Sequence, residues 1–263
     1  TIGFGARRLN DDDKDSPKYL NTPETPIYHK SQVLYGLDLA KKEITRNRKV
    51  VIVEGYTDVM AAHAAGVGYA VASCGTAFGE DHVKIVRRLL GDSADSASGA
   101  GLSNGKTHGG EVIFTFDGDA AGQKAALRAF EMDQNFAAQT FVAVEPNGMD
   151  PCELRMAQGE RAVVELVNSR TPLFEFVIRS VLRQLDLRTA EGRVKALRAA
   201  APVVARIRDH ALQREYTRSL AGWIGMDISE VSRAVRSSAH SRPASYAGRG
   251  APAETPQPAP VRR

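Results

Sequence analysis

The chain has 263 residues, of which 43% are hydrophobic and 25% charged, and its formal net charge is +4. A chain of this length and composition can bury a hydrophobic core and form more than one lobe. No run of eighteen apolar residues is present to span a membrane, and two cysteines without a CxxC pair support neither a disulfide scaffold nor a cysteine zinc site. We expect a cytoplasmic protein with reduced thiols.

Short apolar segments alternate with helical patterns between residues 50 and 145. We predict strands over residues 50–53, 69–73, 111–116 and 140–145. The predicted helices cover residues 58–66, 80–91 and 120–133. Strands this apolar, separated by helices, predict an α/β fold in which a mainly parallel sheet has helices on both faces.

Residues 92–110, between the second predicted helix and the third strand, are rich in Ser, Gly and Ala. They have no helical or strand periodicity, so we expect a mobile surface loop. The stretch AGLSNGKT within it is similar to a phosphate-binding P-loop. Ala100 stands where that motif requires glycine, and no strand precedes it, so we reject this site.

From about residue 160 onward the pattern is helical. We expect helices to begin at Thr171-Pro172, after Thr189 as a cap, and at a capping box formed by Asp227 and Glu230. Residues 171–263 contain 16 Lys/Arg and 8 Asp/Glu, whereas residues 1–170 contain 19 Lys/Arg and 23 Asp/Glu. A basic helical region fits a polyanionic partner such as nucleic acid.

Three carboxylates lie at the ends of predicted strands. Glu54 follows the first strand, and Asp117 and Asp119 follow the third. One such acid is more often a loop residue or helix cap, but loops at the carboxyl ends of neighbouring parallel strands converge. Carboxylates brought together there repel one another unless a cation neutralises them, and hard oxygen ligands suit Mg²⁺. The sequence therefore predicts a magnesium site.

Three stretches, VVIVEGYTDV, VASCGTAF and FTFDGDAAGQKAALRA, resemble the signatures of the TOPRIM fold as it occurs in bacterial DNA primase. The preceding phrases IGFGARRL, PKYLNTPET and YHKSQVLYGL are similar to the end of the primase segment before TOPRIM. The resemblance covers residues 1–236 apart from residues 92–110. It implies template-directed synthesis of RNA primers from ribonucleoside triphosphates on single-stranded DNA, by metal-dependent nucleotidyl transfer at the replication fork.

The resemblance also implies a division of the chain. The expected parts are the end of the pre-TOPRIM segment (1–47), the TOPRIM domain (48–149), an all-helical subdomain (150–236) and a disordered Pro/Ala-rich linker (237–263). We expect a further domain beyond the linker, through which the family contacts the replicative helicase. The zinc site of the family is expected outside this chain, before its amino terminus.

The acidic residues of the family motif map onto four positions. Glu54 is expected to bind metal and to assist proton transfer, and Asp117 and Asp119 to bind Mg²⁺, for which Mn²⁺ can substitute. Asp58 is expected to face the site where nucleotide and metal meet. By the same resemblance, three cations contact the triphosphate or the template: Arg7, Lys18 and Lys30.

One position departs from the family pattern of two acids after the fourth strand. The chain has MDPCEL there, so Asp150 is kept and Cys152 replaces the second acid. We expect Asp150 to remain a ligand or to support one, and Cys152 to be inert.

Three residues after the second strand have no assigned catalytic role. Ser73 and Thr76 either form a turn or line the metal cleft, and His82 is expected to be structural.

Two other functions stay open. A TOPRIM nuclease or topoisomerase cuts DNA, but the tyrosines available to a topoisomerase, Tyr216 and Tyr246, fall in a predicted helix and the linker. A phosphatase is disfavoured, because DGDAA lacks the hydroxyl residue usually found two positions after the second Asp. The chain could also bind metal, nucleotide and DNA without being active alone.

Overall fold

The computed structural model describes residues 2–8, 19–73, 75–91, 110–117, 129–130 and 138–240. Within these residues a five-stranded sheet has the strand order β4-β3-β5-β6-β7. Its strands are β3 (Lys49–Val53), β4 (Ala70–Ala72), β5 (Glu111–Asp117), β6 (Gln139–Glu145) and β7 (Thr171–Pro172). All neighbouring pairs are parallel except β6 and β7, which confirms the mainly parallel α/β prediction.

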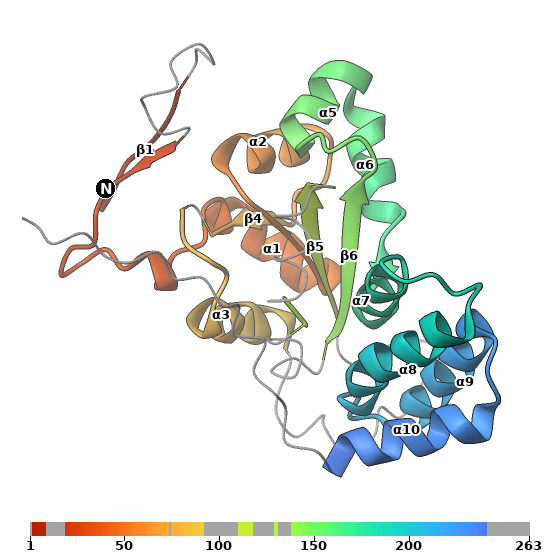
Figure 1. The fold of residues 1–263 in the computed structure, drawn as a ribbon. Helices are drawn as coiled ribbons and strands as arrows, with labels where there is room; N and C mark the ends of the chain where they lie inside the picture. The colour runs from red at the N-terminus through yellow and green to blue at the C-terminus, as the bar shows by residue number, and fades with distance from the viewer. Residues whose placement is uncertain are drawn as a thin grey trace, which may run out of the picture.

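Both faces of the sheet are apolar because alternate residues of a strand point to opposite sides. Val50 and Ile52 of β3 belong to one hydrophobic cluster, and Val51 and Val53 to the other. The first cluster includes residues of α1 (Leu37–Asn47), α3 (Glu80–Leu90) and α7 (Leu173–Leu182). The second includes residues of α2 (Tyr56–Ala64), α5 (Pro151–Gln158) and α6 (Glu160–Asn168). The helices therefore cover both faces (Figure 1).

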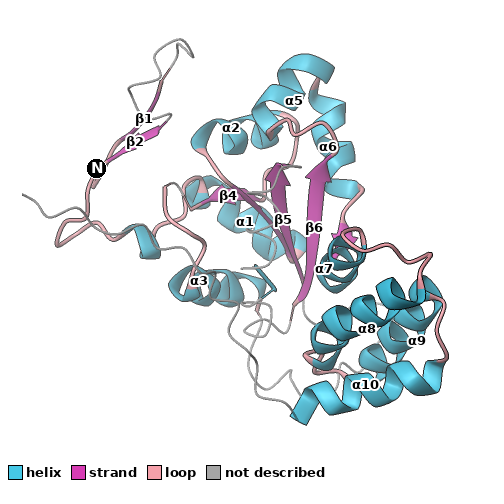
Figure 2. Ribbon diagram, viewed as in Figure 1, coloured by secondary structure: helices cyan, strands magenta, loops and turns pink. Residues whose placement is uncertain are grey.

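The amino-terminal residues extend away from the sheet. Strands β1 (Gly5–Arg7) and β2 (Tyr19–Asn21) form an antiparallel pair on the left of Figure 2, and the short helix η1 (Lys30–Gln32) follows. Tyr35 then pairs with Ala72 of β4 through two backbone hydrogen bonds of 2.8 and 3.2 Å. This segment is thereby anchored to the edge strand of the sheet.

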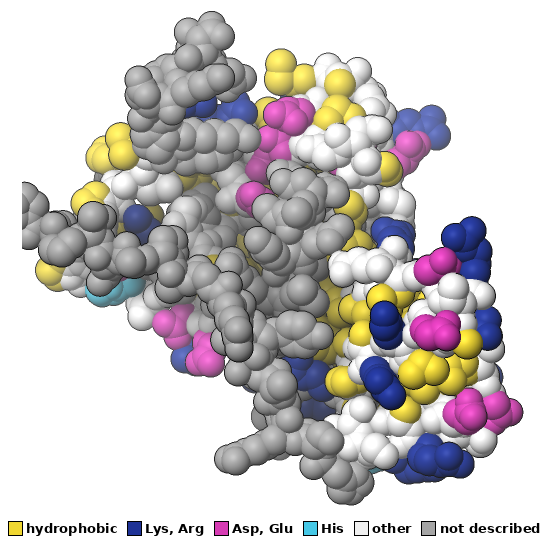
Figure 3. Space-filling view, in the orientation of Figure 1, with side chains coloured by type: hydrophobic (Ala, Val, Ile, Leu, Met, Phe, Trp, Pro, Cys, Tyr) yellow, Lys and Arg dark blue, Asp and Glu magenta, His cyan; other side chains and the backbone are white. Residues whose placement is uncertain are grey.

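After α7 the chain forms a helical bundle with α8 (Ala190–Ala205), α9 (His210–Ile224) and α10 (Ile228–His240). The bundle has its own hydrophobic cluster, in which Ile178, Leu220 and Val231 are fully buried. The predicted cap is confirmed, because the Thr189 hydroxyl accepts a hydrogen bond from the Gly192 N–H at 3.0 Å. In Figure 3, Lys/Arg and Asp/Glu side chains are interspersed over the visible face of the bundle.

Two boundaries differ from the prediction. Thr171-Pro172 forms β7 against β6, so α7 begins at Leu173 and not at Thr171. Helix α10 continues to His240, with the Ser238 hydroxyl bonded to the Ala234 carbonyl, so the linker predicted from residue 237 cannot begin before 241. Helix ends vary by one or two residues, because the last turn lacks full hydrogen bonding.

Several predictions fall outside the described residues. These are most of the loop at 92–110, most of the helix at 120–133, and the linker from residue 241. In the described part of the chain, no helix combines the length and apolar character needed to cross a membrane.

Candidate metal and nucleotide site

The carboxyl ends of β3 and β5 lie side by side, as the sequence predicted. The two strands are parallel neighbours in which Ile52 is opposite Phe114. Continuing this register places Glu54 level with Phe116, one residue before Asp117, the last residue of β5. The buried Thr115 hydroxyl donates to the Ile52 carbonyl at 3.1 Å and ties the strands together just below this edge. Glu54 is exposed there, whereas the side chain of Asp117 and all of Asp119 lie outside the described residues.

Asp58 lies in the first turn of α2, directly after Glu54. It is 3% exposed, and its Oδ2 accepts a hydrogen bond from the Gly55 N–H at 2.9 Å. This bond satisfies a backbone donor at the amino end of the helix. The Asp58 carboxylate is therefore fixed at the start of α2, next to the carboxyl end of β3.

Asp150 is the amino-terminal cap of α5. Its Oδ1 accepts from the Glu153 N–H at 2.7 Å, and Glu153 Oε2 accepts from the Asp150 N–H at 3.3 Å, which is a capping box. Pro151 occupies the first helical position. This capping role was not predicted, although the pattern Asp-Pro-x-Glu signals it.

Cys152 lies near an acid of α2 and an acid at the start of α5. Burial raises the pKa of its thiol, and the negative charges of Asp150 and Asp58 raise it further, against smaller opposing effects of Arg7 and a hydrogen bond with Thr57. These interactions place Asp58 and Asp150 around one position. They also keep the thiol protonated at neutral pH, which favours an inert Cys152, since metals bind the thiolate.

Lys30 is the first residue of η1, which contacts α3. Its backbone N–H donates to Glu24 Oε1 at 2.9 Å, and its carbonyl lies 2.9 Å from Nε2 of His82 in α3. Arg7 lies on β1. Lys18 lies outside the described residues.

The residues after β4 form a turn. The Ser73 hydroxyl donates to the Thr76 carbonyl at 2.8 Å, across three residues. This bond favours the turn hypothesis for Ser73 and Thr76 over a direct role in the cleft.

The described acids are the right donors for a hard divalent cation. Glu54, Asp58 and Asp150 present carboxylate oxygens, which Mg²⁺ prefers. Among the described residues, no group of three or more His, Cys, Asp or Glu is arranged to hold a metal. The predicted set needs Asp117 and Asp119 to be complete.

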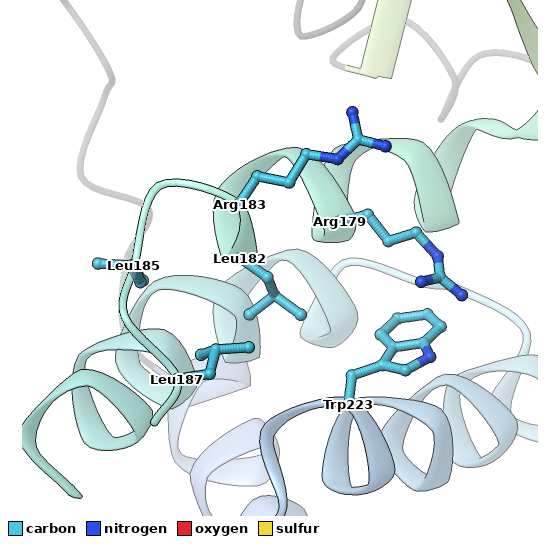
Figure 4. Close-up of a pocket in the computed structure, with 6 residues that line it drawn as sticks. All are labelled: Arg179, Leu182, Arg183, Leu185, Leu187 and Trp223. Atoms are coloured by element: carbon cyan, nitrogen blue, oxygen red, sulfur yellow. The ribbon is translucent and has the colours of Figure 1, made fainter. Parts of the chain in front are cut away.

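A separate hollow lies in the helical bundle (Figure 4). Its volume is about 440 Å³, and it is lined by Arg179, Leu182, Arg183, Leu185, Leu187 and Trp223. No acid or nucleophile is among these residues, so the hollow cannot hold the predicted metal.

The fold and the acidic edge define a Toprim protein. The Toprim domain family matches residues 48–143, and the family described as DNA primase catalytic core, N-terminal domain, matches residues 1–41. A third family, described as DnaB-helicase binding domain of primase, matches residues 174–229.

Individual relatives narrow the class. The DNA primase of Mycolicibacterium smegmatis is 56% identical over 240 residues, which are 91% of this chain and 36% of the relative. The RNA polymerase domain of Mycobacterium tuberculosis primase, solved with double-stranded DNA, is 54% identical with a TM-score of 0.70, over 86% of this chain and 67% of that domain. A DNA primase domain from Pseudomonas aeruginosa is 33% identical with a TM-score of 0.65, and the match covers 89% of this chain and 68% of that domain.

This chain therefore belongs to the bacterial DNA primase family. It aligns with about two thirds of the RNA polymerase domain and spans roughly a third of the curated relative.

Proposed function

We propose that this chain is the catalytic part of a DNA primase that synthesises short RNA primers on single-stranded DNA. The observation that carries the proposal is the shared carboxyl edge of β3 and β5, where Glu54 and Asp117 end neighbouring parallel strands. Membership of the primase family favours this reaction over the DNA cleavage of other Toprim enzymes.

The proposed reaction is nucleotidyl transfer from a ribonucleoside triphosphate to a 3′-hydroxyl. Glu54, Asp117 and Asp119, with Asp150 in support, would hold Mg²⁺, or Mn²⁺ in its place. When bound, this cation activates the attacking oxygen and neutralises charge on the phosphates. Glu54 is exposed at the edge and is suited to accept the proton of the attacking hydroxyl.

Three cations would position the reactants. We assign Arg7, Lys18 and Lys30 to the triphosphate or the template, and Asp58 to the junction of nucleotide and metal. Fixed ammonium and guanidinium groups near phosphates supply orientation and charge stabilisation, which are the main protein contributions to phosphoryl chemistry. The arginines of the bundle would contact backbone phosphates with little sequence preference.

We also propose that the bundle takes part in contacting the replicative helicase. The match to the helicase-binding family covers residues 174–229, from α7 to the start of α10. From the sequence, we expected that contact in a domain outside the chain. This match extends the expected partner surface into the chain itself.

A priming assay tests the proposal against its rivals. A chain extended to the full RNA polymerase domain is incubated with single-stranded DNA, labelled ribonucleotides and Mg²⁺. We expect labelled RNA from the unaltered protein and at least tenfold less from E54Q. E165Q removes one exposed carboxylate of α6 and should prime normally. Cut DNA, or binding without RNA, would favour the nuclease or the binding module.

A further inference from the structure

We infer that His82, together with Glu24, is a positioning residue that holds the backbone of Lys30 in place for its proposed contact with phosphate. The inference rests on the proposed function, because Lys30 is a proposed phosphate contact. His82 belongs to the Toprim part of the chain and Lys30 to the segment before it, 52 residues earlier.

The hydrogen bonds of His82 define its role. The side chain is 0% exposed, and Nδ1 accepts from the Gly79 N–H at 3.2 Å. A neutral imidazole that accepts at Nδ1 carries its proton on Nε2. Nε2 lies 2.9 Å from the Lys30 carbonyl and 3.2 Å from the Val33 carbonyl, so it donates to both. One ring thereby joins the start of α3 to both ends of η1.

Both backbone groups of Lys30 are held by side chains. Glu24 accepts from its N–H at 2.9 Å, and His82 donates to its carbonyl. Its ammonium group forms no ion pair with any carboxylate in the described part of the chain. The backbone is therefore fixed while the charged end stays available for an anion, which is the arrangement that a phosphate contact needs.

The same ring also connects Lys30 to the strand that carries Asp117. Phe78 stacks on His82 with ring centroids 5.3 Å apart, and it packs edge-on against Phe114 of β5 at 5.4 Å. Because protein interiors are close-packed, a small displacement of one buried side chain also shifts the side chains packed against it. The position of Lys30 is thus set relative to β5, at whose carboxyl end the metal is proposed.

A purely structural histidine is the competing explanation. Such a residue would stabilise the fold, but the effect of replacing it on ATP affinity would be the same with and without Lys30. A double-mutant cycle separates the two cases, since residues that act through one another show non-additive effects.

The experiment measures the affinity of the 263-residue chain for Mg²⁺-ATP by calorimetry. The variants are H82F, K30M and the double variant, and thermal stability is recorded for each. H63F is the matched control, because His63 Nε2 also lies 2.9 Å from a backbone carbonyl, that of Ala70 on β4. We expect H82F to weaken ATP binding about tenfold in the parent and less than twofold in the K30M background, because misplacing a binding group by about 1 Å costs up to ~100-fold. H63F should leave affinity unchanged, and H82Q, which retains a donor and an acceptor, should recover part of the loss.

Four results would overturn the inference. Parent-like affinity in folded H82F, or an equal loss with and without Lys30, would show that His82 is only structural. If H82F does not fold, E24A instead removes the acceptor of the Lys30 N–H at an exposed position, and unchanged affinity in E24A would refute the inference. Failure of the parent chain to bind Mg²⁺-ATP would instead refute the proposed function, and the inference with it.

Discussion

The carboxyl edge of the sheet and the helical bundle use charge in different ways. At the edge, Asp58 and Asp150 are 3% and 7% exposed and accept hydrogen bonds from backbone N–H groups. In the bundle, Arg179 pairs with Glu175 and Arg218 with Glu215, each within one helix. Exposed pairs of this kind contribute about 0–1 kcal/mol each. Backbone hydrogen bonds therefore fix these acids in place at the edge, whereas the bundle distributes charge over its surface.

Primer synthesis should show the largest effect, because we propose that it needs the rest of the RNA polymerase domain in addition to the acidic edge. This chain covers 67% of the related RNA polymerase domain. We expect a chain extended to the full length of that domain to yield at least about 100-fold more primer, since orienting two reactants supplies much of the rate. The measurement is labelled RNA on a single-stranded template. Comparable yields from the two chains would mean that the edge alone suffices.

Metal binding should depend on the edge and not on the bundle. D117N removes charge at nearly constant shape, so we expect Mn²⁺ affinity to fall at least tenfold. Relief of repulsion between carboxylates should keep or raise the melting temperature of the metal-free protein. Calorimetry and thermal unfolding check both effects. Parent-like Mn²⁺ affinity in D117N would contradict the assignment of the Asp-Gly-Asp motif.

A substitution in the bundle should lower stability and leave metal affinity unchanged. Asp209 accepts hydrogen bonds from the N–H groups of Ala211 and Leu212 and caps α9. D209A should therefore cost about 1 kcal/mol in the free energy of unfolding, with Mn²⁺ affinity unchanged. Urea unfolding gives the first quantity. A loss of Mn²⁺ affinity in this variant would show that bundle and edge are coupled.

The effect of Asp209 should also vary with pH in a defined direction. Backbone hydrogen bonds from Leu212 and Ala211 lower the pKa of Asp209 below the ordinary value of 3.8. A lowered pKa in the folded state contributes stability above the unfolded pKa, and this contribution is lost as pH falls through the folded pKa. The difference between parent and D209A should thus be full at neutral pH and shrink below about pH 4. A difference that grows with acid would contradict the cap.

Cys152 should give the smallest effect. Burial and the nearby carboxylates raise the pKa of its thiol, so it is not a thiolate ligand at neutral pH. C152S should change Mn²⁺ affinity less than twofold. A tenfold loss, about 1.4 kcal/mol, would show that the thiol takes the place of the missing acid.

The features that the sequence predicted correctly are local or follow from strand order. Glu54 and Asp117 each follow an apolar strand, and parallel pairing alone brings those strand ends together. Thr189 was predicted as a cap because its hydroxyl bonds to a backbone N–H only three residues later in the sequence. The roles of all the proposed site residues remain predictions, and Asp119 and Lys18 also lie outside the described residues.

The features that were missed depend on distant contacts. Thr171-Pro172 is a strand only because β6 lies beside it, and two residues carry no strand periodicity. The bond between His82 and Lys30 joins residues 52 positions apart, which no local pattern encodes. Asp150 is an exception, since its capping box is local and could have been read from the sequence.

We propose that the edge formed by β3 and β5 holds a divalent cation. A crystal of this chain soaked in Mn²⁺ tests it directly, because anomalous scattering locates manganese without assumptions about ligands. We expect an anomalous peak at the carboxyl ends of β3 and β5, within coordination distance of Glu54 and Asp117, and its loss in D117N. Manganese bound only elsewhere, or an unchanged peak in D117N, would contradict the account.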